Sequence, residues 1–138
     1  LISMQGGEYA IEKRMQEIDE AGNKATDVEK RLYTVLEVAL EMVKRGFTFL
    51  PIDITLSDAK DFVISKERKA LRLPFVALDG LGAKVAQTII DARNEKPFAS
   101  RDDIKDRTSL STTLFNKLDA LGAFGDLPET GQINLFEL

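Results

Sequence analysis

Apolar residues recur every three or four positions in the first part of the chain, which is the period of one helical face. In residues 8–21 these positions are Ile11, Met15 and Ile18. The same period returns over residues 27–45, with a broader apolar face. We therefore expect two helices that serve as core scaffolding and carry no chemistry of their own.

Capping residues mark the ends of these two helices. Thr26 and Glu29 have the spacing of a capping box, in which each side chain accepts a hydrogen bond from the other's backbone N–H. Gly22 and Gly46 stand where the two helices would end, because glycine readily adopts the conformation that closes a helix.

The period changes after residue 46. Residues 47–54 alternate between apolar and polar positions and contain Pro51, as is typical of an edge strand. Residues 61–64 and 70–73 are the other strand candidates, with a basic turn over 65–69. This pattern predicts a small β-hairpin or a three-stranded patch.

Helical spacing resumes over residues 83–93. Ser100 caps a short helix that has Asp103 in its first turn, where a carboxylate is favourable. Ser109 or Ser111 caps a last helix, and from residue 125 the sequence has the composition of a linker. The fold class is therefore predicted to be mainly α with a small β patch and a flexible C-terminal tail.

Residues 78–82 read Leu-Asp-Gly-Leu-Gly and stand directly before the helix that begins at Ala83. Glycines let the backbone turn sharply and approach another group closely, and a helix start presents unpaired N–H groups to an anion. The same pattern also occurs in ordinary tight turns. Read as a phosphate site, it predicts contacts to the DNA backbone without sequence preference. The candidate residues are Gly80, Leu81, Gly82, Ala83 and Lys84.

Charge is unevenly distributed, although the chain as a whole carries −4. Residues 1–59 hold 7 basic and 11 acidic residues, residues 60–101 hold 9 and 5, and residues 102–138 hold 3 and 7. The only positive segment therefore contains the glycine hairpin. Such a run also occurs on plain solvated surfaces, but beside an anion site it favours phosphate contact. The cluster ahead of the hairpin, also a candidate for DNA contact, is Lys66, Arg68, Lys69 and Arg72.

Composition excludes several classes of function. The chain has no cysteine and no histidine, which removes disulfides, most zinc sites, thiol nucleophiles and histidine-based triads. No apolar run approaches the roughly 20 residues that cross a bilayer. We expect a cytoplasmic protein without a membrane partner. Because the chain starts at Leu1 with no capping signal, we also expect it to be a fragment of a longer protein.

The last residues carry apolar side chains that a linker would not need. Residues 132–136, Gln132, Ile133, Asn134, Leu135 and Phe136, have the character of a short linear motif that docks into a partner's pocket. The alternative is that Phe136 packs back onto the domain.

These motifs together resemble known families. The hairpin and the Lys, Ala, Ile-Ile and Ala-Arg positions after it resemble the helix-hairpin-helix family of DNA-binding elements. Gln-Ile-Asn-Leu-Phe resembles the peptide by which bacterial replication proteins engage the sliding clamp, with Ile133 in place of the usual leucine. Residues 34–42, 45–49 and 73–82 resemble the C-terminal region of PolC-type DNA polymerase III.

The polymerase resemblance implies a division of the chain into three parts. Residues 1–72 would be the end of the fingers region, residues 73–126 a helix-hairpin-helix domain that binds duplex DNA, and residues 127–138 a linker with a clamp-binding tail. The implied partners are double-stranded DNA, the sliding clamp and other subunits of the polymerase III holoenzyme.

The resemblance also implies that the catalytic groups lie elsewhere. The parent would be a DNA-directed DNA polymerase with a 3′-5′ exonuclease and bound Mg²⁺, and its catalytic aspartates would lie upstream in the palm. The fragment would bind no cofactor or metal and be inactive alone. Asp53 and Asp58 are the carboxylates nearest an extended segment, and we expect them to be solvated or to cap turns.

Two other interpretations remain open on the sequence alone. The chain could be a helix-hairpin-helix adaptor of a repair or recombination complex, with residues 8–45 as an oligomerisation surface. Alternatively, the basic segment could be plain surface and the chain a structural domain.

Overall fold

The computed structural model describes residues 6–65 and 67–130, and its chain divides into two compact units. One unit consists of Leu1–Leu50 with Ile64–Leu71, and the other of Pro51–Val63 with Arg72–Leu138. We call them the first and the second unit. The chain passes from the first to the second unit for the last time between Leu71 and Arg72, next to the boundary expected after residue 72. Pro51–Val63 precedes that boundary but belongs to the second unit.

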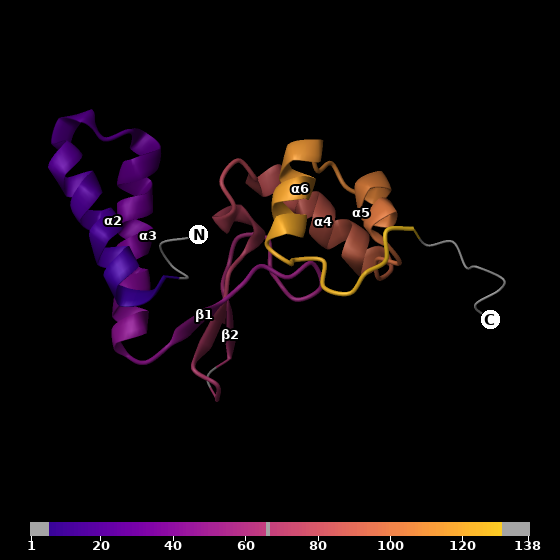
Figure 1. Ribbon diagram of the computed structural model, residues 1–138, viewed down its shortest axis with the longest axis horizontal. Helices are drawn as coiled ribbons and strands as arrows, with labels where there is room; N and C mark the ends of the chain where they lie inside the picture. The colour runs from indigo at the N-terminus through magenta and orange to yellow at the C-terminus, as the bar shows by residue number, and fades with distance from the viewer. Residues whose placement is uncertain (1–5, 66, 131–138) are drawn as a thin grey trace. The chain divides into compact units, whose positions relative to one another are not determined.

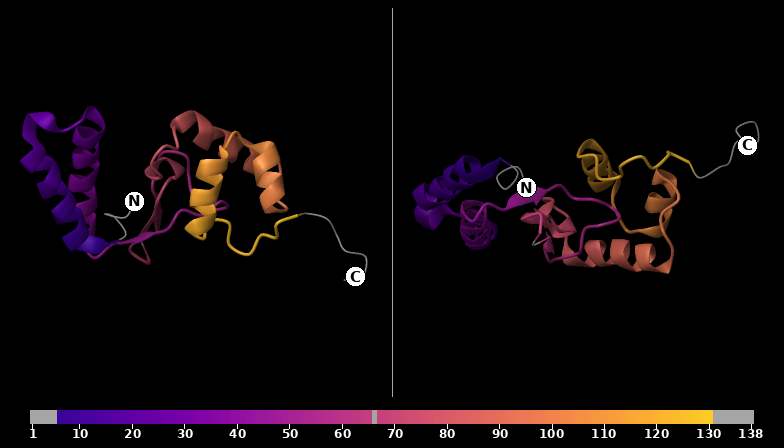
Figure 2. Two further views of the ribbon diagram at one scale, coloured as in Figure 1. Left: turned by 45° about the horizontal axis from the view of Figure 1, so that its top comes forward. Right: turned by 90° about the horizontal axis from the view of Figure 1, so that it is seen from below.

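The first unit is built on a hairpin of two helices, α2 (Gly7–Ala21) and α3 (Asp27–Lys44), which run side by side in Figures 1 and 2. Both predicted helices are thus confirmed to within one residue at each end. The short 3-10 turn η1 (Gly22–Lys24) connects them, and Gly22 has a positive φ of 54°. The side chains that the two helices bury are Ile11, Ile18, Leu36 and Ala39.

The predicted capping box is present at the start of α3. The Thr26 hydroxyl accepts a hydrogen bond from Glu29 N at 3.1 Å, and the Glu29 carboxylate accepts one from Thr26 N at 3.3 Å. Two of the N–H groups that a helix start leaves unpaired are satisfied in this way. The local sequence therefore defines where α3 begins.

Three short strands form one sheet in the order β1-β3-β2, which confirms the three-stranded patch. They are β1 (Thr48–Leu50), β2 (Val63–Ser65) and β3 (Ala70–Arg72), each shorter than its predicted range. Thr48 N donates to Lys69 O at 2.9 Å, so β1 and β3 start side by side and run parallel. The strand β1 stops before Pro51, which has no N–H to continue a ladder.

Up to residue 130, where the described part of the chain ends, the second unit contains three helices and a 3-10 turn around one apolar core. They are η2 (Phe75–Ala77), α4 (Ala83–Glu95), α5 (Arg101–Arg107) and α6 (Thr112–Ala120). The side chains least exposed in this core include Leu73, Phe75, Ile89, Ile104 and Leu118. Helix α4 extends two residues beyond the predicted end at residue 93.

Serine caps, which were expected, and a segment that folds back after α6 close the second unit. The Ser100 hydroxyl caps α5, and Ser111, rather than Ser109, caps α6 by accepting from Leu114 N. The rings of Phe115 and Phe124 lie 4.8 Å apart between centroids, so the residues after α6 fold back onto it. The mainly α fold class with a small sheet is thereby confirmed.

Two features are absent from residues 6–65 and 67–130. In that part of the chain no helix is long and apolar enough to cross a membrane. The same residues contain no group of three or more aspartate, glutamate, histidine or cysteine side chains placed to hold a metal ion.

Candidate nucleic-acid interface

The turn before α4 is a glycine hairpin whose apolar residues point into the core. Leu78 and Leu81 are 6% and 3% exposed, and Leu81 N donates to Leu78 O at 3.0 Å. Gly80 has a φ of +88°, a conformation that residues with a side chain rarely adopt. The sequence grouped Leu81 with the DNA-contacting residues. In the structure its side chain and its N–H are both used inside the protein, so it supports the turn from within.

The start of α4 is open. Gly82 is the N-cap residue, no side chain caps the helix, and the first helical hydrogen bond runs from Ala86 N to Gly82 O at 3.0 Å. Helix geometry therefore leaves the N–H groups of residues 82–85 without intrahelical partners, and they donate no hydrogen bond to any other group in the described part of the chain. The first turn of α4 contains no acidic residue, and Lys84 is exposed in it. Such an end attracts anions.

The surface around Gly82 leaves room for a close approach. Gly82 has an ordinary φ of −80°, and a Cβ built on it would meet no atom within 4 Å. Of the candidate residues in the hairpin, Gly80, Gly82, Ala83 and Lys84 are exposed. The geometry can therefore present backbone N–H groups and one ammonium group to a phosphate.

The basic cluster predicted ahead of the hairpin is divided by the fold. Arg68 and Lys69 are exposed in the turn between β2 and β3 and belong to the first unit. Arg72 belongs to the second unit, where its guanidinium donates to Pro51 O at 3.0 Å. Lys66 lies outside the described residues. Sequence proximity to the hairpin is therefore no guide to which unit carries each charge.

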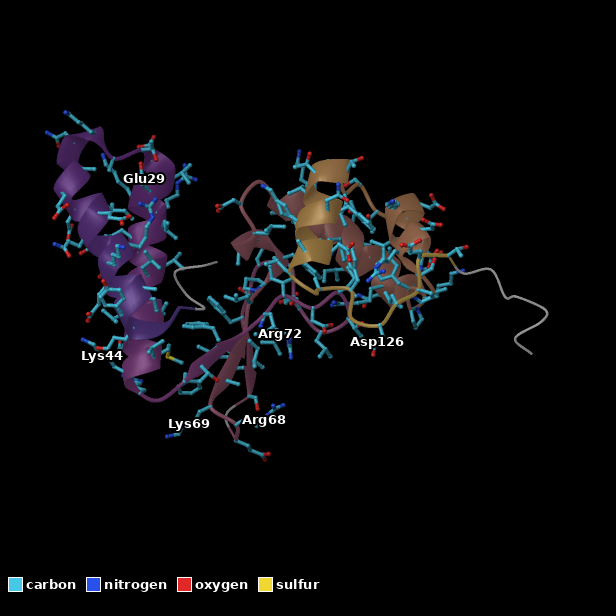
Figure 3. All side chains as sticks on the ribbon, viewed as in Figure 1. Glu29, Lys44, Arg68, Lys69, Arg72 and Asp126 are labelled. Atoms are coloured by element: carbon cyan, nitrogen blue, oxygen red, sulfur yellow. The ribbon has the colours of Figure 1, made fainter. Side chains whose placement is uncertain are left out.

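A neighbour of Lys69 was not anticipated from the sequence. A Cβ on Gly46, just after α3, would lie 3.8 Å from Lys69 Cδ and 3.9 Å from its Nζ, so the lysine side chain passes over this glycine. Figure 3 shows Lys44, Arg68 and Lys69 toward one end of the first unit. Lys69 itself has a φ of +48°. The first unit thus has a basic end, which consists of Lys44 from the end of α3 and of Arg68 and Lys69 from the turn between β2 and β3.

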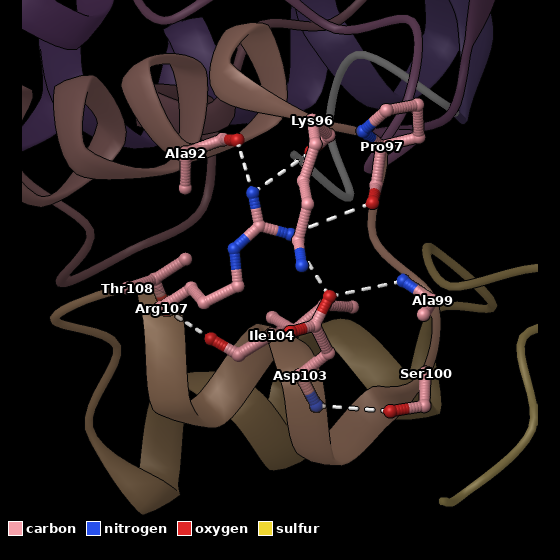
Figure 4. A network of polar contacts seen from close by, with 9 residues as sticks. All are labelled: Ala92, Lys96, Pro97, Ala99, Ser100, Asp103, Ile104, Arg107 and Thr108. Carbon is pink, nitrogen blue, oxygen red and sulfur yellow. Dashed lines mark hydrogen bonds and ion pairs between the residues drawn. The ribbon is translucent and has the colours of Figure 1, made fainter. Parts of the chain in front are cut away.

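Arg107 binds the chain between α4 and α5, as Figure 4 shows. Its Nη2 donates to Ala92 O at 2.5 Å and to Lys96 O at 2.8 Å, and its Nη1 donates to Pro97 O at 3.4 Å. Its guanidinium also lies over the Phe98 ring, 4.9 Å from the centroid. The last carbonyls of α4 therefore receive a cationic donor, which is favourable at a helix C-terminus.

Asp103 completes this network (Figure 4). Its Oδ2 accepts from Arg107 Nη1 at 2.8 Å and from Ala99 N at 3.0 Å, while Ser100 Oγ accepts from Asp103 N. The backbone hydrogen bond from Ala99 and the neighbouring Arg107 lower the pKa of the Asp103 carboxyl below its ordinary value of 3.8. The sequence predicted Asp103 as a carboxylate near a helix start and missed Arg107. Their four-residue spacing on one helix was the available signal.

This pKa shift predicts an acid-dependent loss of stability. A carboxyl whose pKa is lower in the folded state contributes stability above its unfolded pKa and loses it as the pH falls through the folded value. We expect Asp103→Asn to be destabilising at pH 7 and to cost less as the pH falls below about 4. Urea unfolding of both chains across this range gives the comparison, and a difference that does not change with pH would contradict it.

Arg93 holds the loop before β2 against α4. Its Nη1 donates to Ile54 O at 3.1 Å and to Ser57 O at 2.7 Å, and burial lowers the pKa of its guanidinium, which remains charged. Ser57 is fully buried, and its hydroxyl donates to Leu73 O at 2.8 Å and accepts from Asp53 N. Arg93 thereby binds the loop before β2 to α4, and Ser57 binds that loop to Leu73, just after β3.

The two candidate carboxylates of this loop cap turns, as expected. Asp53 Oδ1 accepts from Thr55 N at 2.8 Å and from Leu56 N at 3.0 Å. Asp58 Oδ1 accepts from Ala59 N at 2.8 Å. These oxygens therefore serve the local backbone.

Comparison with known proteins is consistent with this geometry. A family model described as "Helix-hairpin-helix motif" matches residues 46–132. The chain is 45% identical over 136 residues to the DNA polymerase III PolC-type of Pediococcus pentosaceus, 49% over 131 residues to that of Thermotoga maritima and 42% over 139 residues to that of Streptococcus suis. These matches cover 99%, 94% and 99% of this chain, which spans 9% of the length of each of these curated relatives.

Proposed function

The chain belongs to the helix-hairpin-helix family and fits a fragment of a PolC-type DNA polymerase III, and on this premise we propose that it grips duplex DNA by its sugar-phosphate backbone. The observation that carries the proposal is the open start of α4, where N–H groups of residues 82–85 and the exposed Lys84 face outward. No base-reading side chain is needed for such a contact, so binding is independent of sequence.

The basic end of the first unit supplies a second source of attraction. Lys44, Arg68 and Lys69 add long-range charge that favours association with a polyanion. Glu12 lies 4.0 Å from Lys44, so part of this charge is offset. The hairpin provides the directed contact, and the basic end strengthens the encounter.

Within the whole protein, this part holds the duplex while the chemistry takes place elsewhere. We propose that the parent is a DNA-directed DNA polymerase with an associated exonuclease, that its catalytic carboxylates and Mg²⁺ belong to the rest of the polypeptide, and that it works in the cytoplasm with other polymerase III subunits. The high identity to proteins named as polymerases favours this function over an adaptor of repair or recombination.

Reversing the charge of Lys84 tests the duplex contact. We expect Lys84→Glu to weaken binding several-fold at low salt, equally for unrelated duplex sequences, and Lys84→Ala to reduce the log–log salt slope by about 1. Lys13→Glu, on α2, makes the same change in net charge and serves as the control. Fluorescence anisotropy with two labelled duplexes measures both quantities. An equal loss in the control, or a loss confined to one duplex, would exclude the proposed contact.

We further propose that residues 132–136 bind the sliding clamp. These residues lie outside the described part of the chain, and the proposal comes from the resemblance of Gln-Ile-Asn-Leu-Phe to clamp-binding peptides. A partner without an apolar pocket would bind equally well without the adjacent side chains of Leu135 and Phe136.

Replacing Leu135 and Phe136 together by alanine is expected to weaken clamp binding by more than about 100-fold, since burial of each side chain contributes about 1.5–3 kcal/mol. Surface plasmon resonance on an immobilised sliding clamp measures the change, with Glu137→Ala as the control. Clamp binding that survives the double substitution would refute the role of this motif, and it would leave the duplex contact untouched.

A further inference from the structure

The segment after α6 returns to the second unit and binds the start of α5. Arg101 N donates to Pro128 O at 2.8 Å, and Asp102 N donates to Glu129 O at 2.9 Å. Leu127 is half-buried, and its N–H donates to Phe124 O at 3.2 Å. Figures 1 and 2 show this yellow segment reaching α5 before residue 130. The linker composition of these residues gave no sign of these bonds.

These bonds complete the N-terminus of α5. A helix leaves its first N–H groups unpaired, and in α5 the third is already satisfied by Ser100 Oγ, which accepts from Asp103 N. The carbonyls of Pro128 and Glu129 satisfy the first and second. Helix α5 has only seven residues, a length at which a helix depends on its tertiary contacts. The helix and the returning segment therefore stabilise each other.

We propose that residues 127–130 form a strap that anchors the C-terminal segment to α5 and sets the point from which it leaves the domain. This inference rests on the proposed function in one respect only, the role of residues 132–136 in binding a partner. The strap itself is a property of the folded chain and is testable without that partner.

The strap shortens the reach of the partner-binding segment. Gln132 follows Glu129 by three residues, and three residues of chain span at most about 11 Å. A linker free from Gly125 onward would let the same residue move up to about 25 Å from that glycine. A partner bound at residues 132–136 is therefore held close to α5, and a shorter tether gives a higher effective concentration of the partner at the domain when the geometry fits.

Proline at position 101 removes one strap bond with little harm to the helix. Arg101 is the first residue of α5, a position where proline is well tolerated, and Ser100 before it is extended, with φ −162° and ψ 171°. Arg101→Pro lacks the N–H that donates to Pro128. Arg101→Ala is the matched control, because it keeps this N–H while losing the Arg101–Asp119 ion pair, which proline also removes.

Hydrogen exchange on the full chain measures the anchor. We expect the Asp102 amide to exchange at least about tenfold faster in Arg101→Pro than in Arg101→Ala, because release of the strap exposes it to water. The Ile89 amide in α4 should keep its protection in both, which shows that the unit stays folded. An Asp102 amide that is equally unprotected in all three chains would overturn the strap.

Distance measurement tests the effect on the exit point. The chain has no cysteine, so Asp106→Cys on α5 and Gly131→Cys can carry a pair of spin labels. We expect a narrow distance distribution that becomes broader and longer when Arg101→Pro is added, and identical distributions would overturn the proposal. A strap that passes both tests in a chain that fails to bind the clamp would refute the clamp proposal alone.

Discussion

Replacing Arg107 by alanine is expected to lower the free energy of unfolding of the second unit by about 1.5–3 kcal/mol. The guanidinium is the shared donor for Ala92 O, Lys96 O and Asp103 Oδ2, and its side chain is only 16% exposed. Without it, Ala92 O and Asp103 Oδ2 keep their hydrogen bonds from Lys96 N and Ala99 N but lose their charged donor, and Lys96 O loses the donor at 2.8 Å. Hydrogen bonds to a charged group typically contribute about 1.5–3 kcal/mol, and this pair is partly buried.

Urea unfolding, combined with hydrogen exchange in α4, measures this effect within the second unit. Arg45→Ala is the control, since Arg45 pairs with Glu41 on the exposed surface of α3 and such pairs contribute about 0–1 kcal/mol. Arg107→Lys should recover only part of the loss, because an ammonium group cannot reach both α4 carbonyls and the carboxylate in the planar geometry of a guanidinium. A cost no larger than that of Arg45→Ala would show that the network is not structural.

Much of the helical framework was predictable because its signals are local. The capping box at Thr26 and Glu29, the glycines after the first two helices and the serine caps of α5 and α6 each act within four residues of the boundary they define. The apolar period marked faces that the helices bury only in part, because α3 buries Leu36 and Ala39 but leaves Val28 and Val35 exposed. Strand lengths were less predictable, because a three-residue strand depends on where its neighbour offers hydrogen bonds.

The contacts that bind the second unit together were mostly invisible in the sequence. Arg107, Arg93 and the strap use backbone carbonyls as acceptors, and every residue carries a carbonyl whatever its side chain. No pattern of side chains can therefore mark them. The division of the basic cluster was hidden for a similar reason, since the crossing of the chain between units depends on tertiary packing rather than on charge.

The candidate interface itself was partly predictable. Glycine content, the apolar residues at 78 and 81 and the helix that follows were enough to predict the hairpin, and the structure adds that the two glycines have different roles. Gly80 is required by its positive φ, whereas Gly82 has a backbone conformation that any residue adopts. This difference yields a pair of substitutions with different expected results.

Gly80→Ala is expected to lower the free energy of unfolding by about 1–2 kcal/mol, the usual cost of a left-handed conformation for a residue with a Cβ. Its Cβ would make only an ordinary contact, 3.7 Å from Leu114 Cδ2, so the backbone conformation accounts for the cost. Gly82→Ala should change the free energy of unfolding by less than about 0.5 kcal/mol, because nothing lies within 4 Å of the added Cβ and the freedom lost by the unfolded chain offsets the weaker N-capping by alanine. Thermal unfolding of the two variants gives the contrast.

A bulkier residue at position 82 should weaken the binding of duplex DNA, although the fold tolerates it. Gly82→Val places its methyl groups beside the N–H groups that would meet a phosphate, so we expect about tenfold weaker binding, equal to about 1.4 kcal/mol, in a chain that remains folded. Asn94→Val is the matched control, since it puts the same side chain on an exposed position of α4 about 18 Å along the helix. If Gly82→Val binds as tightly as the unchanged chain, the open end of α4 is not a phosphate site. A comparable loss in Asn94→Val would instead show that valine weakens binding through the helix and not through the contact.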